Sequence, residues 1–343
     1  MKRILLTITI NLFVFLSSIQ QVDARAFCAL RDPVSTIKLL FPESTHHRSV
    51  VKAINSEVRD RISSILPFTL HFNELGKHTL YVVENNANSV GYVHVRSELT
   101  KWGLVEIAWG LKPDLTIRSV HFQRCRIPDC DGVHLENVLE LTVGKSYGEL
   151  IKLIEDDGKT LVPEVLEKIS DPSAASFSLD AIKSAIKTMV VTSITWEEEV
   201  ANINRKLLLE ESFGVDKKIS LNAIEIPANR FNELEKLMGG GGSMVDRESI
   251  KAFQLTFDGR ELGTLVSANW KHMKFEGMFN WLFDTSGKIL AIQPYPAWPN
   301  DEVSQSFEEL HGAIINNEEQ CNTAAQLIAY ELYYLSHDRT TVK

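Results

Sequence analysis

The sequence has little positive charge and the composition of an ordinary globular chain. Its 343 residues include 36 Lys and Arg against 45 Asp and Glu, which gives a formal net charge of −9. Because nucleic-acid binding needs clustered positive charge, this acidic balance argues against nucleic acid as the main partner. Hydrophobic residues make up 44% and charged residues 24% of the chain. These proportions exclude a mainly disordered chain and a polytopic membrane protein.

Complete motifs for catalysis and metal binding are missing. The chain has no Gly-x-Ser-x-Gly sequence, and no Ser-x-x-Lys sequence stands beside its partner motifs. No second close pair of Cys or His completes a zinc site with Cys125 and Cys130. The glycine-rich stretch 239–243 lacks the lysine of a phosphate-binding loop, so it predicts a flexible hinge. These residues predict no metal site and leave open whether the chain is an enzyme.

The stretch 1–26 has the pattern of a secretory signal peptide. Lys2 and Arg3 provide a positive start, and the mostly apolar stretch 4–19 follows. Ala24 and Ala26 place small residues at the −3 and −1 positions of a cleavage site. We therefore expect an exported protein, in the periplasm or the cell envelope. An uncleaved N-terminal anchor is the alternative, although the apolar stretch falls short of the roughly 20 residues that span a bilayer.

Four cysteines remain in the expected mature chain: Cys28, Cys125, Cys130 and Cys321. An oxidising compartment would permit disulfides, and four cysteines allow three complete pairings. Cys125 and Cys130 are close enough in sequence to close a small loop. The alternative is a reactive thiol at Cys125, where the neighbouring arginines would favour the thiolate. The sequence leaves the pairing open.

Alternating patterns in both halves of the chain predict two antiparallel β-meanders. Short turns separate the predicted strands, whereas parallel strands would need crossovers of a dozen or more residues. The strands are expected at 78–83, 91–97, 104–111 and 117–122, and again at 252–255, 263–267, 277–284 and 288–292. Helices are expected at 32–41, 49–66, 146–156, 179–194, 196–213, 304–311 and 323–336. The predicted fold class is α+β, with two similar modules, each an antiparallel β-meander packed with helices.

The two meanders align without gaps when the first is moved along the chain by a constant offset of 172 positions. The matched pairs are Tyr81 and Phe253, Gly91 and Gly263, Val93 and Leu265, Trp109 and Trp281, Ile117 and Ile289, and Val120 and Ile292. This pattern predicts an internal duplication, and chance similarity of two meanders is the alternative. The expected domains are a signal peptide at 1–26, a first module at 27–195, a helical linker with the glycine-rich loop at 196–249, and a shorter second repeat at 250–343.

Polar side chains alternate along the predicted strand 91–97. Tyr92, His94 and Arg96 fall on one face of that strand, a face that could bind an anion. The alternative is the solvated face of a half-buried sheet. Trp109 and Trp281 stand at equivalent points of the two halves, where they are expected to anchor the core or to stack on a planar ligand.

Five segments of the sequence resemble one known family. They are Leu39-Leu40-Phe41-Pro42, Gly91-Tyr92-Val93, Lys101-Trp102-Gly103-Leu104-Val105-Glu106-Ile107, Asp114-Leu115-Thr116-Ile117 and Asp180-Ala181-Ile182-Lys183-Ser184-Ala185-Ile186. Together they resemble the FMN-binding domain family of exported flavoproteins, which includes the flavin-bearing subunits of sodium-pumping quinone reductases and Rnf complexes. The resemblance covers about Asp32 to Val191, and more weakly Ile250 to Leu335. It implies a meander followed by a helix that carries the flavin motif.

The flavin motif itself is altered in this chain. In the family it reads Asp-Ala-x-Ser-Gly-Ala-Thr, and its threonine carries FMN through a phosphoester bond. On residues 180–186, Ser184 replaces the glycine and Ile186 replaces the threonine. Isoleucine has no hydroxyl, so covalent attachment there is excluded, and Thr188 lies about 200° further around the helix. The resemblance therefore implies noncovalent FMN.

Noncovalent FMN would need an anion site for its phosphate and a flat apolar slot for its ring. Arg96 or Lys101 could supply the charge, and Trp102 or Trp109 could stack on the ring. Ser178 is expected to cap a helix that begins at 176–180, whose N-terminus could bind phosphate. The predicted cofactor-binding residues are Arg96, Lys101, Trp102, Trp109, Ser178, Ser184 and Thr188.

The resemblance implies an exported electron-transfer protein that binds FMN and meets a redox partner protein. The alternative is a non-enzymatic envelope protein that kept the duplicated fold and lost the flavin. Such a protein would bind a peptide, a polysaccharide or a partner protein through its exposed sheet faces. A thiol-redox protein that uses Cys125 and Cys130 is the third hypothesis.

Overall fold

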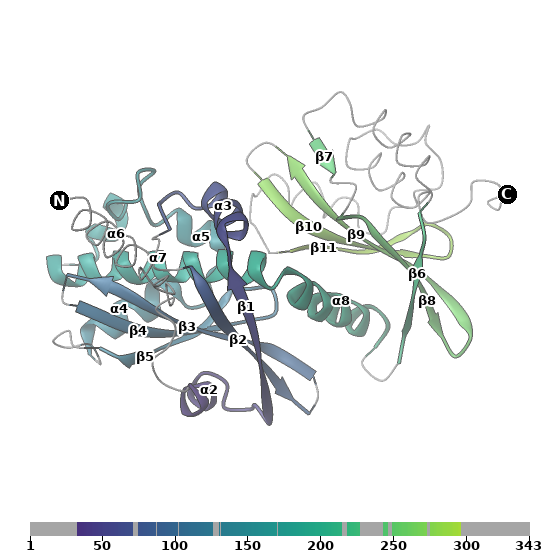
Figure 1. The fold of residues 1–343 in the computed structure, drawn as a ribbon, viewed down its shortest axis with the longest axis horizontal. Helices are drawn as coiled ribbons and strands as arrows, with labels where there is room; N and C mark the ends of the chain where they lie inside the picture. The colour runs from purple at the N-terminus through teal and green to yellow at the C-terminus, as the bar shows by residue number, and fades with distance from the viewer. Residues whose placement is uncertain are drawn as a thin grey trace, which may run out of the picture.

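The structure, a computed structural model, describes residues 33–70, 75–86, 88–101, 103–125, 130, 132–169, 171–214, 218–226, 243–245, 249–272 and 275–295. Two antiparallel sheets and their helices make up this part of the chain (Figure 1). The α+β fold with two similar meander modules is thereby confirmed. No helix among these residues is both long enough and apolar enough to cross a bilayer. The predicted signal peptide, residues 239–242 of the glycine-rich loop and the two predicted helices after residue 300 lie outside the described residues.

The first sheet has five strands in the order β1-β2-β3-β4-β5. They are β1 (His46–Ile54), β2 (Gly76–Asn85), β3 (Asn88–Thr100), β4 (Gly103–Leu111) and β5 (Ile117–Arg124). Helices α2 (Val34–Leu40) and α3 (Ser56–Ile65) precede and follow β1. Every neighbouring pair of strands is antiparallel, as the short predicted turns require.

The predicted helix at 49–66 is wrong in its first part. Residues 46–54 form β1, which pairs with β2 from its first residue to its last. Helix α3 begins only after Asn55, whose side chain accepts a hydrogen bond from the Val58 amide. The apolar residues of this segment fit a helical period, but the edge of β2 satisfies the backbone of β1 as a strand.

Five helices follow the first sheet: α4 (Val133–Thr142), α5 (Tyr147–Ile151), α6 (Pro163–Leu166), α7 (Pro172–Thr195) and α8 (Glu197–Phe213). The long helix α7 lies across one face of the sheet, against β3 (Figure 1). Its residues Phe177, Ile182 and Ile186 share one hydrophobic core with Tyr92 and Trp109 of the sheet. Burial of these large side chains holds α7 in place over the strands.

Cys125 and Cys130 form a disulfide directly after β5, with their Cα atoms 6.3 Å apart. Of the pairings that the sequence left open, the structure therefore contains the one that closes the small loop. Cys125 is not a free thiol in this state, so its neighbouring arginines do not activate it. Cys28 and Cys321 lie outside the described residues.

The second sheet has six strands, in the order β11-β10-β9-β8-β6 with β7 paired to β9. They are β6 (Ser220–Ile224), β7 (Ser243–Val245), β8 (Lys251–Phe257), β9 (Arg260–His272), β10 (Phe275–Asp284) and β11 (Ile289–Tyr295). Strands β6 and β7 fall in the range 196–249, for which the sequence predicts a helical linker. The second sheet therefore begins before residue 250.

The two meanders repeat each other residue by residue in their strand pairing. Tyr92 pairs with Leu111 between β3 and β4, and their counterparts at the same offset, Thr264 and Phe283, pair between β9 and β10. The irregularities repeat as well: a register shift follows Val83 in the first sheet, and another follows the equivalent residue 255 in the second. The predicted internal repeat is confirmed in the strands.

The repeat also includes the helix that precedes each sheet. In the first module, Ile37 of α2 and Phe41 pack against the face of the sheet opposite α7. Their counterparts at the same offset, Leu209 of α8 and Phe213, pack in one cluster with Leu265 of the second sheet. The last turns of α8 are therefore the counterpart of α2, and α8 belongs structurally to the second module as well as to the connection.

Gly91 and Gly263 occupy the same position in the two sheets, and both have a positive φ, 150° and 144°. A Cβ atom on Gly91 would collide with the carbonyl oxygen of Leu111. On Gly263 it would collide with the carbonyl oxygen of Phe283, which is the counterpart of Leu111 in the repeat. Both sites therefore require glycine for the same two reasons, backbone conformation and the close approach of the neighbouring strand.

Gly91→Ala and Gly263→Ala are each expected to lower the free energy of unfolding by roughly 3 kcal/mol, because strain at positive φ adds to a collision with backbone. Gly103→Ala is the matched control, since Gly103 has φ 110° and open space where its Cβ would lie. Urea denaturation of the three variants measures the difference. Equal losses at Gly91 and Gly103 would contradict the collision.

Candidate functional site

Most of the predicted cofactor-binding residues lie together between the first sheet and α7. Arg96 comes from β3, Trp109 from β4, and Ser178, Ser184 and Thr188 from α7. All five are buried. Lys101 is exposed in the turn after β3, and Trp102 lies outside the described residues.

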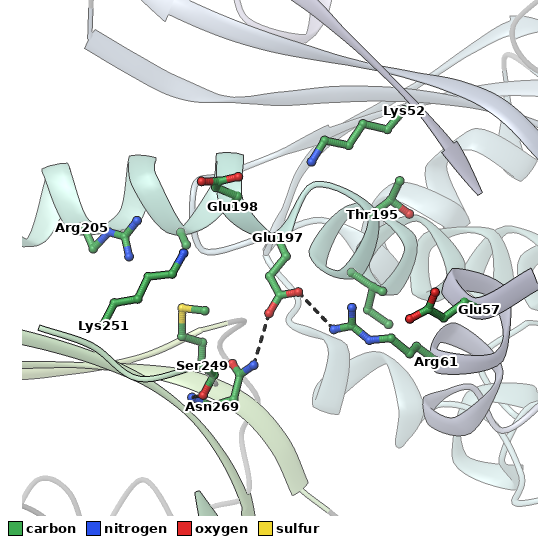
Figure 2. A pocket seen from close by; sticks show the side chains of 13 residues that line it. Lys52, Glu57, Arg61, Thr195, Glu197, Glu198, Arg205, Ser249, Lys251 and Asn269 are labelled. Carbon is green, nitrogen blue, oxygen red and sulfur yellow. Dashed lines mark hydrogen bonds and ion pairs between the residues drawn. The ribbon is translucent and has the colours of Figure 1, made fainter. Parts of the chain in front are cut away.

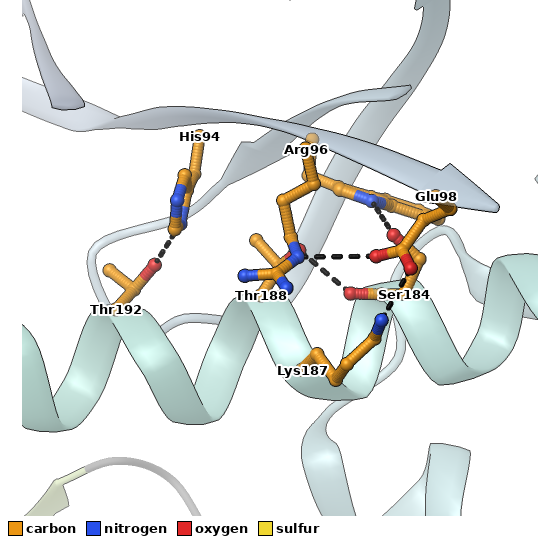
Figure 3. Close-up of polar contacts among 8 residues, drawn as sticks. His94, Arg96, Glu98, Ser184, Lys187, Thr188 and Thr192 are labelled. Carbon is orange, nitrogen blue, oxygen red and sulfur yellow. Dashed lines mark hydrogen bonds and ion pairs between the residues drawn. The ribbon is translucent and has the colours of Figure 1, made fainter. Parts of the chain in front are cut away.

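The polar groups in this interface form a buried ion-pair cluster, here called the Glu98 cluster, made of Arg96, Glu98 and Lys187 (Figure 3). Arg96 Nε donates to Glu98 Oε1 at 3.2 Å, and Lys187 Nζ donates to Glu98 Oε2. Residues 96 and 98 share one face of β3 because side chains alternate along a strand. That face lies under α7, so the alternative of a solvated face is wrong.

The charges of the Glu98 cluster affect the pKa values of Glu98 and Lys187. Burial alone would raise the pKa of Glu98, but the positive charges of Lys187 and Arg96 outweigh burial and lower it. Burial lowers the pKa of Lys187, and the charge of Glu98 opposes this effect. The cluster therefore places two positive charges on one carboxylate in a poorly solvated place, where a free ion would be costly, and the charge of Asp180 also acts on Lys187.

The motif residues of α7 bond to their own surroundings. Trp109 Nε1 donates to Ser184 Oγ at 3.1 Å, and Thr188 Oγ1 donates to the backbone oxygen of Ser184 at 2.7 Å. Ile186 is fully buried in the core. Burial raises the pKa of Asp180, the first residue of the motif, to about 6. Each of these contacts is internal to the fold.

Ser178 does not cap a helix, and that prediction is wrong. Helix α7 begins at Pro172, and the side chain of Asp171 caps it by accepting a hydrogen bond from the Ser173 amide. Asp followed by Pro is a stronger start signal than a serine further along the segment. The backbone N–H groups around Ser178 lie inside the helix, so they are not available to a phosphate.

A flavin does not fit among these side chains as they are arranged. The Arg96 guanidinium that was expected to meet the phosphate is bonded to Glu98. Trp109 is fully buried and its indole N–H is bonded to Ser184, so it offers no face to a ring. Arg96, Trp109, Ser184 and Thr188 bond within the interface instead, whereas the buried hydroxyl of Ser178 has no hydrogen-bond partner among the described residues. Because Ile186 stands where the family has threonine, the covalent route is closed as well.

Two buried histidines extend the polar layer toward the end of α7. His94 Nδ1 lies 3.0 Å from Thr192 Oγ1, and its ring meets the Trp196 ring edge-on at 5.3 Å. His78 lies beside it, with ring centroids 6.1 Å apart. Burial lowers the pKa of His78 to about 4 and that of His94 to about 3. Both imidazoles are therefore neutral at physiological pH, and no group of three metal-ligating side chains gathers in the described part of the chain.

A pocket of about 600 Å³ lies between the two modules, beside the junction of α7 and α8 (Figure 2). Its positive side chains come from four different elements: Lys52 from β1, Arg61 from α3, Arg205 from α8 and Lys251 from β8. Three glutamates also line it, so the described lining carries four positive and three negative charges. This is an excess of one positive charge in a chain of net charge −9.

Glu197 connects the two modules across this pocket. Arg61 of the first module donates to Glu197 Oε2 at 3.1 Å, and Asn269 of the second donates to Glu197 Oε1 at 3.3 Å (Figure 2). Glu197 is the first residue of α8, where its charge also suits the helix N-terminus. Both oxygens of this carboxylate are engaged, which leaves the other charges of the lining to meet a ligand.

Sequence patterns alone identify neither Glu98 and Lys187 nor any of the pocket residues. Glu98 had a usable signal, because it continues the alternation of His94 and Arg96 along the same strand. The pocket had none, since its lining extends from Lys52 to Met278 and each charge by itself resembles any other charge on a protein surface. No protein-family model matches the chain, and neither the curated proteins nor the solved structures include one that is significantly similar to it.

Proposed function

We propose that the chain is a non-enzymatic, exported binding protein that keeps the duplicated fold resembling the FMN-binding family but holds no flavin at the altered motif. The Glu98 cluster is the observation that carries this proposal. In this cluster Glu98 engages both Arg96 and Lys187 between β3 and α7, and the polar groups of Trp109, Ser184 and Thr188 are bonded within the same interface.

Export is part of the same proposal, and two features support it. The stretch 1–26 has the signal-peptide pattern. The disulfide between Cys125 and Cys130 suits an oxidising compartment, because such bonds are rare where thiols are kept reduced. The competing proposal, noncovalent FMN with electron transfer to a redox partner protein, rests on the sequence resemblance.

A titration with FMN separates the two proposals. The chain from residue 27 onward is purified, and quenching of FMN fluorescence is followed as protein is added. We expect no saturable quenching up to ~1 mM protein, the concentration at which a binding free energy of only about 4 kcal/mol would show. The protein should also pass through gel filtration without visible flavin absorbance.

Two variants make the outcome decisive. Lys101→Gln removes an exposed charge that the flavin hypothesis assigns to the phosphate, and Lys168→Gln removes an exposed lysine to which that hypothesis gives no role. Saturable FMN binding that Lys101→Gln weakens and Lys168→Gln leaves unchanged would overturn the proposal. Flavin that co-purifies with the chain and is released on denaturation would overturn it as well.

A further inference from the structure

Arg205 is a buried cation that forms no direct ion pair in the described part of the chain. It is 7% exposed, yet no carboxylate of the described residues lies within 4.0 Å of its guanidinium. Its contacts are neutral: Nη2 donates to Asn202 Oδ1, Nη1 lies 3.4 Å from Ser267 Oγ, and the guanidinium stands 5.2 Å from the centre of the Phe253 ring. Burying a charge that is not paired with an opposite charge is unfavourable. Burial lowers the pKa of Arg205, and the charge of Glu198 opposes this effect without a direct ion pair, so the guanidinium keeps room for an anion in contact with it.

Arg205 lines the pocket between the modules. Other polar side chains that lack a hydrogen-bond or ion-pair partner among the described residues line it too. Thr195, at the end of α7, is buried, and its hydroxyl has no hydrogen-bond partner among the described residues. Lys52 and Lys251, from opposite modules, form no ion pair within 4.0 Å in the described structure. Around one cavity, the described structure thus places three positive charges without a direct ion pair and one hydroxyl without a hydrogen-bond partner (Figure 2).

The rest of the lining restricts the kind of molecule that fits. The described lining contains no aromatic side chain, and its apolar residues are limited to Ile194, Ala201 and Met278. A planar aromatic ligand would therefore find nothing to stack on. Hydroxyl groups of a ligand, in contrast, could donate to the carboxylates of Glu57 and Glu198. The volume of about 600 Å³ is within the range of small-molecule sites.

The geometry points to a binding site for a small, hydroxyl-rich organic anion in the pocket between the two modules. A carboxylate or phosphate of the ligand pairs with Arg205 and is held from the two modules by Lys52 and Lys251. Charge-assisted hydrogen bonds of this kind are short and strong in a partly buried site. The inference rests on the proposed function in one respect, that the chain is a binding protein.

Two sugar-sized probes and one neutral control test the site. Glucuronate carries a carboxylate, glucose 6-phosphate carries a phosphate, and glucose has the same ring without charge. Calorimetric titration into the chain from residue 27 onward is expected to detect one or both anions at millimolar concentration and not glucose. Lys52→Gln and Lys251→Gln are each expected to weaken binding about 10-fold, the factor that corresponds to about 1.4 kcal/mol.

Both lysines project from the surface of a strand, so their replacement by glutamine keeps the fold, and Lys168→Gln is the matched control. Binding of an anion that both pocket variants weaken and Lys168→Gln does not change would support the inference, and the preferred anion would identify carboxylate or phosphate as the source. Failure of both anions to bind, equal binding of glucose, or unchanged affinity in the double variant Lys52→Gln/Lys251→Gln would overturn it. These outcomes are independent of the FMN titration, so failure of the anion site alone is distinguishable from failure of the proposed function.

Discussion

Lys187→Met is expected to lower the free energy of unfolding by about 3–5 kcal/mol, the usual cost of removing one partner from a buried ion pair. The side chain of Lys187 is 7% exposed and that of Glu98 12% exposed, so water does not replace the lost charge. Glu98 would keep Arg96, but its second oxygen would lose the ammonium that donates to it. Methionine conserves most of the volume of lysine, so the loss reports on charge rather than on a cavity. Urea denaturation at neutral pH measures it.

A double-mutant cycle with Glu98→Gln separates the pair from the general effect of each substitution. We expect a coupling energy between residues 98 and 187 of about 2 kcal/mol, since contacting groups in one network couple in that range. Lys159→Met is the surface control, because Lys159 pairs with Asp157 in solvent and should change stability little. A loss for Lys187→Met no larger than for Lys159→Met would show that the Glu98 cluster does not stabilise the interface.

The strands and their repeat could be predicted because their signals are local. Alternation and short turns define each strand of a meander within a short stretch of chain, and the constant offset needs only a comparison of two such patterns. The strand pairing of the two sheets follows the same constant offset, and the register shifts occur at equivalent residues. Gly91 and Gly263 show why: each allows the neighbouring strand to approach at the same place, and only glycine permits it.

Strands β1, β6 and β7 were missed because their partners are distant in sequence. Strand β1 has a helical period of apolar residues, and only its pairing with β2 decides its conformation. Strand β6 is short and mostly exposed, so it carries no alternation of burial that a pattern could reveal. In these cases the tertiary partner outweighs the local preference.

The candidate sites were predictable only in part, for a related reason. The resemblance to the FMN-binding family assigned Arg96, Ser184 and Thr188 to one site, and in the structure all three lie in the interface between β3 and α7. The sequence did not indicate that Glu98 and Lys187, which are 89 residues apart, pair in this interface. Their ion pair makes the interface a closed polar layer rather than an open slot. The pocket between the modules depends on how the second sheet is placed against α8, which no local pattern contains.

Acidification from about pH 7 to about pH 5 is expected to lower the free energy of unfolding through His78 and His94. In the folded protein both remain neutral over this range, since burial lowers their pKa to about 4 and about 3. In the unfolded chain each binds a proton below its ordinary pKa of 6.5. The unfolded state therefore binds more protons, and stability falls as the pH falls, by roughly 2 kcal/mol for each histidine over this interval.

The double variant His78→Gln/His94→Gln isolates this effect, because glutamine is polar and does not titrate. Its stability is expected to change by roughly 4 kcal/mol less than that of the parent between the two pH values, whereas His46→Gln, at an exposed position, controls for the loss of a histidine. Burial raises the pKa of Asp180 to about 6, so its protonation stabilises the fold over the same interval and opposes the histidines. The pKa of Glu98 in the folded protein lies below its ordinary value of 4.5, so this carboxylate titrates mainly below the pH interval considered. Both carboxylates are present in every variant, so only the histidines contribute to the difference. Equal losses in parent and double variant would mean that these two imidazoles take up protons in the folded state.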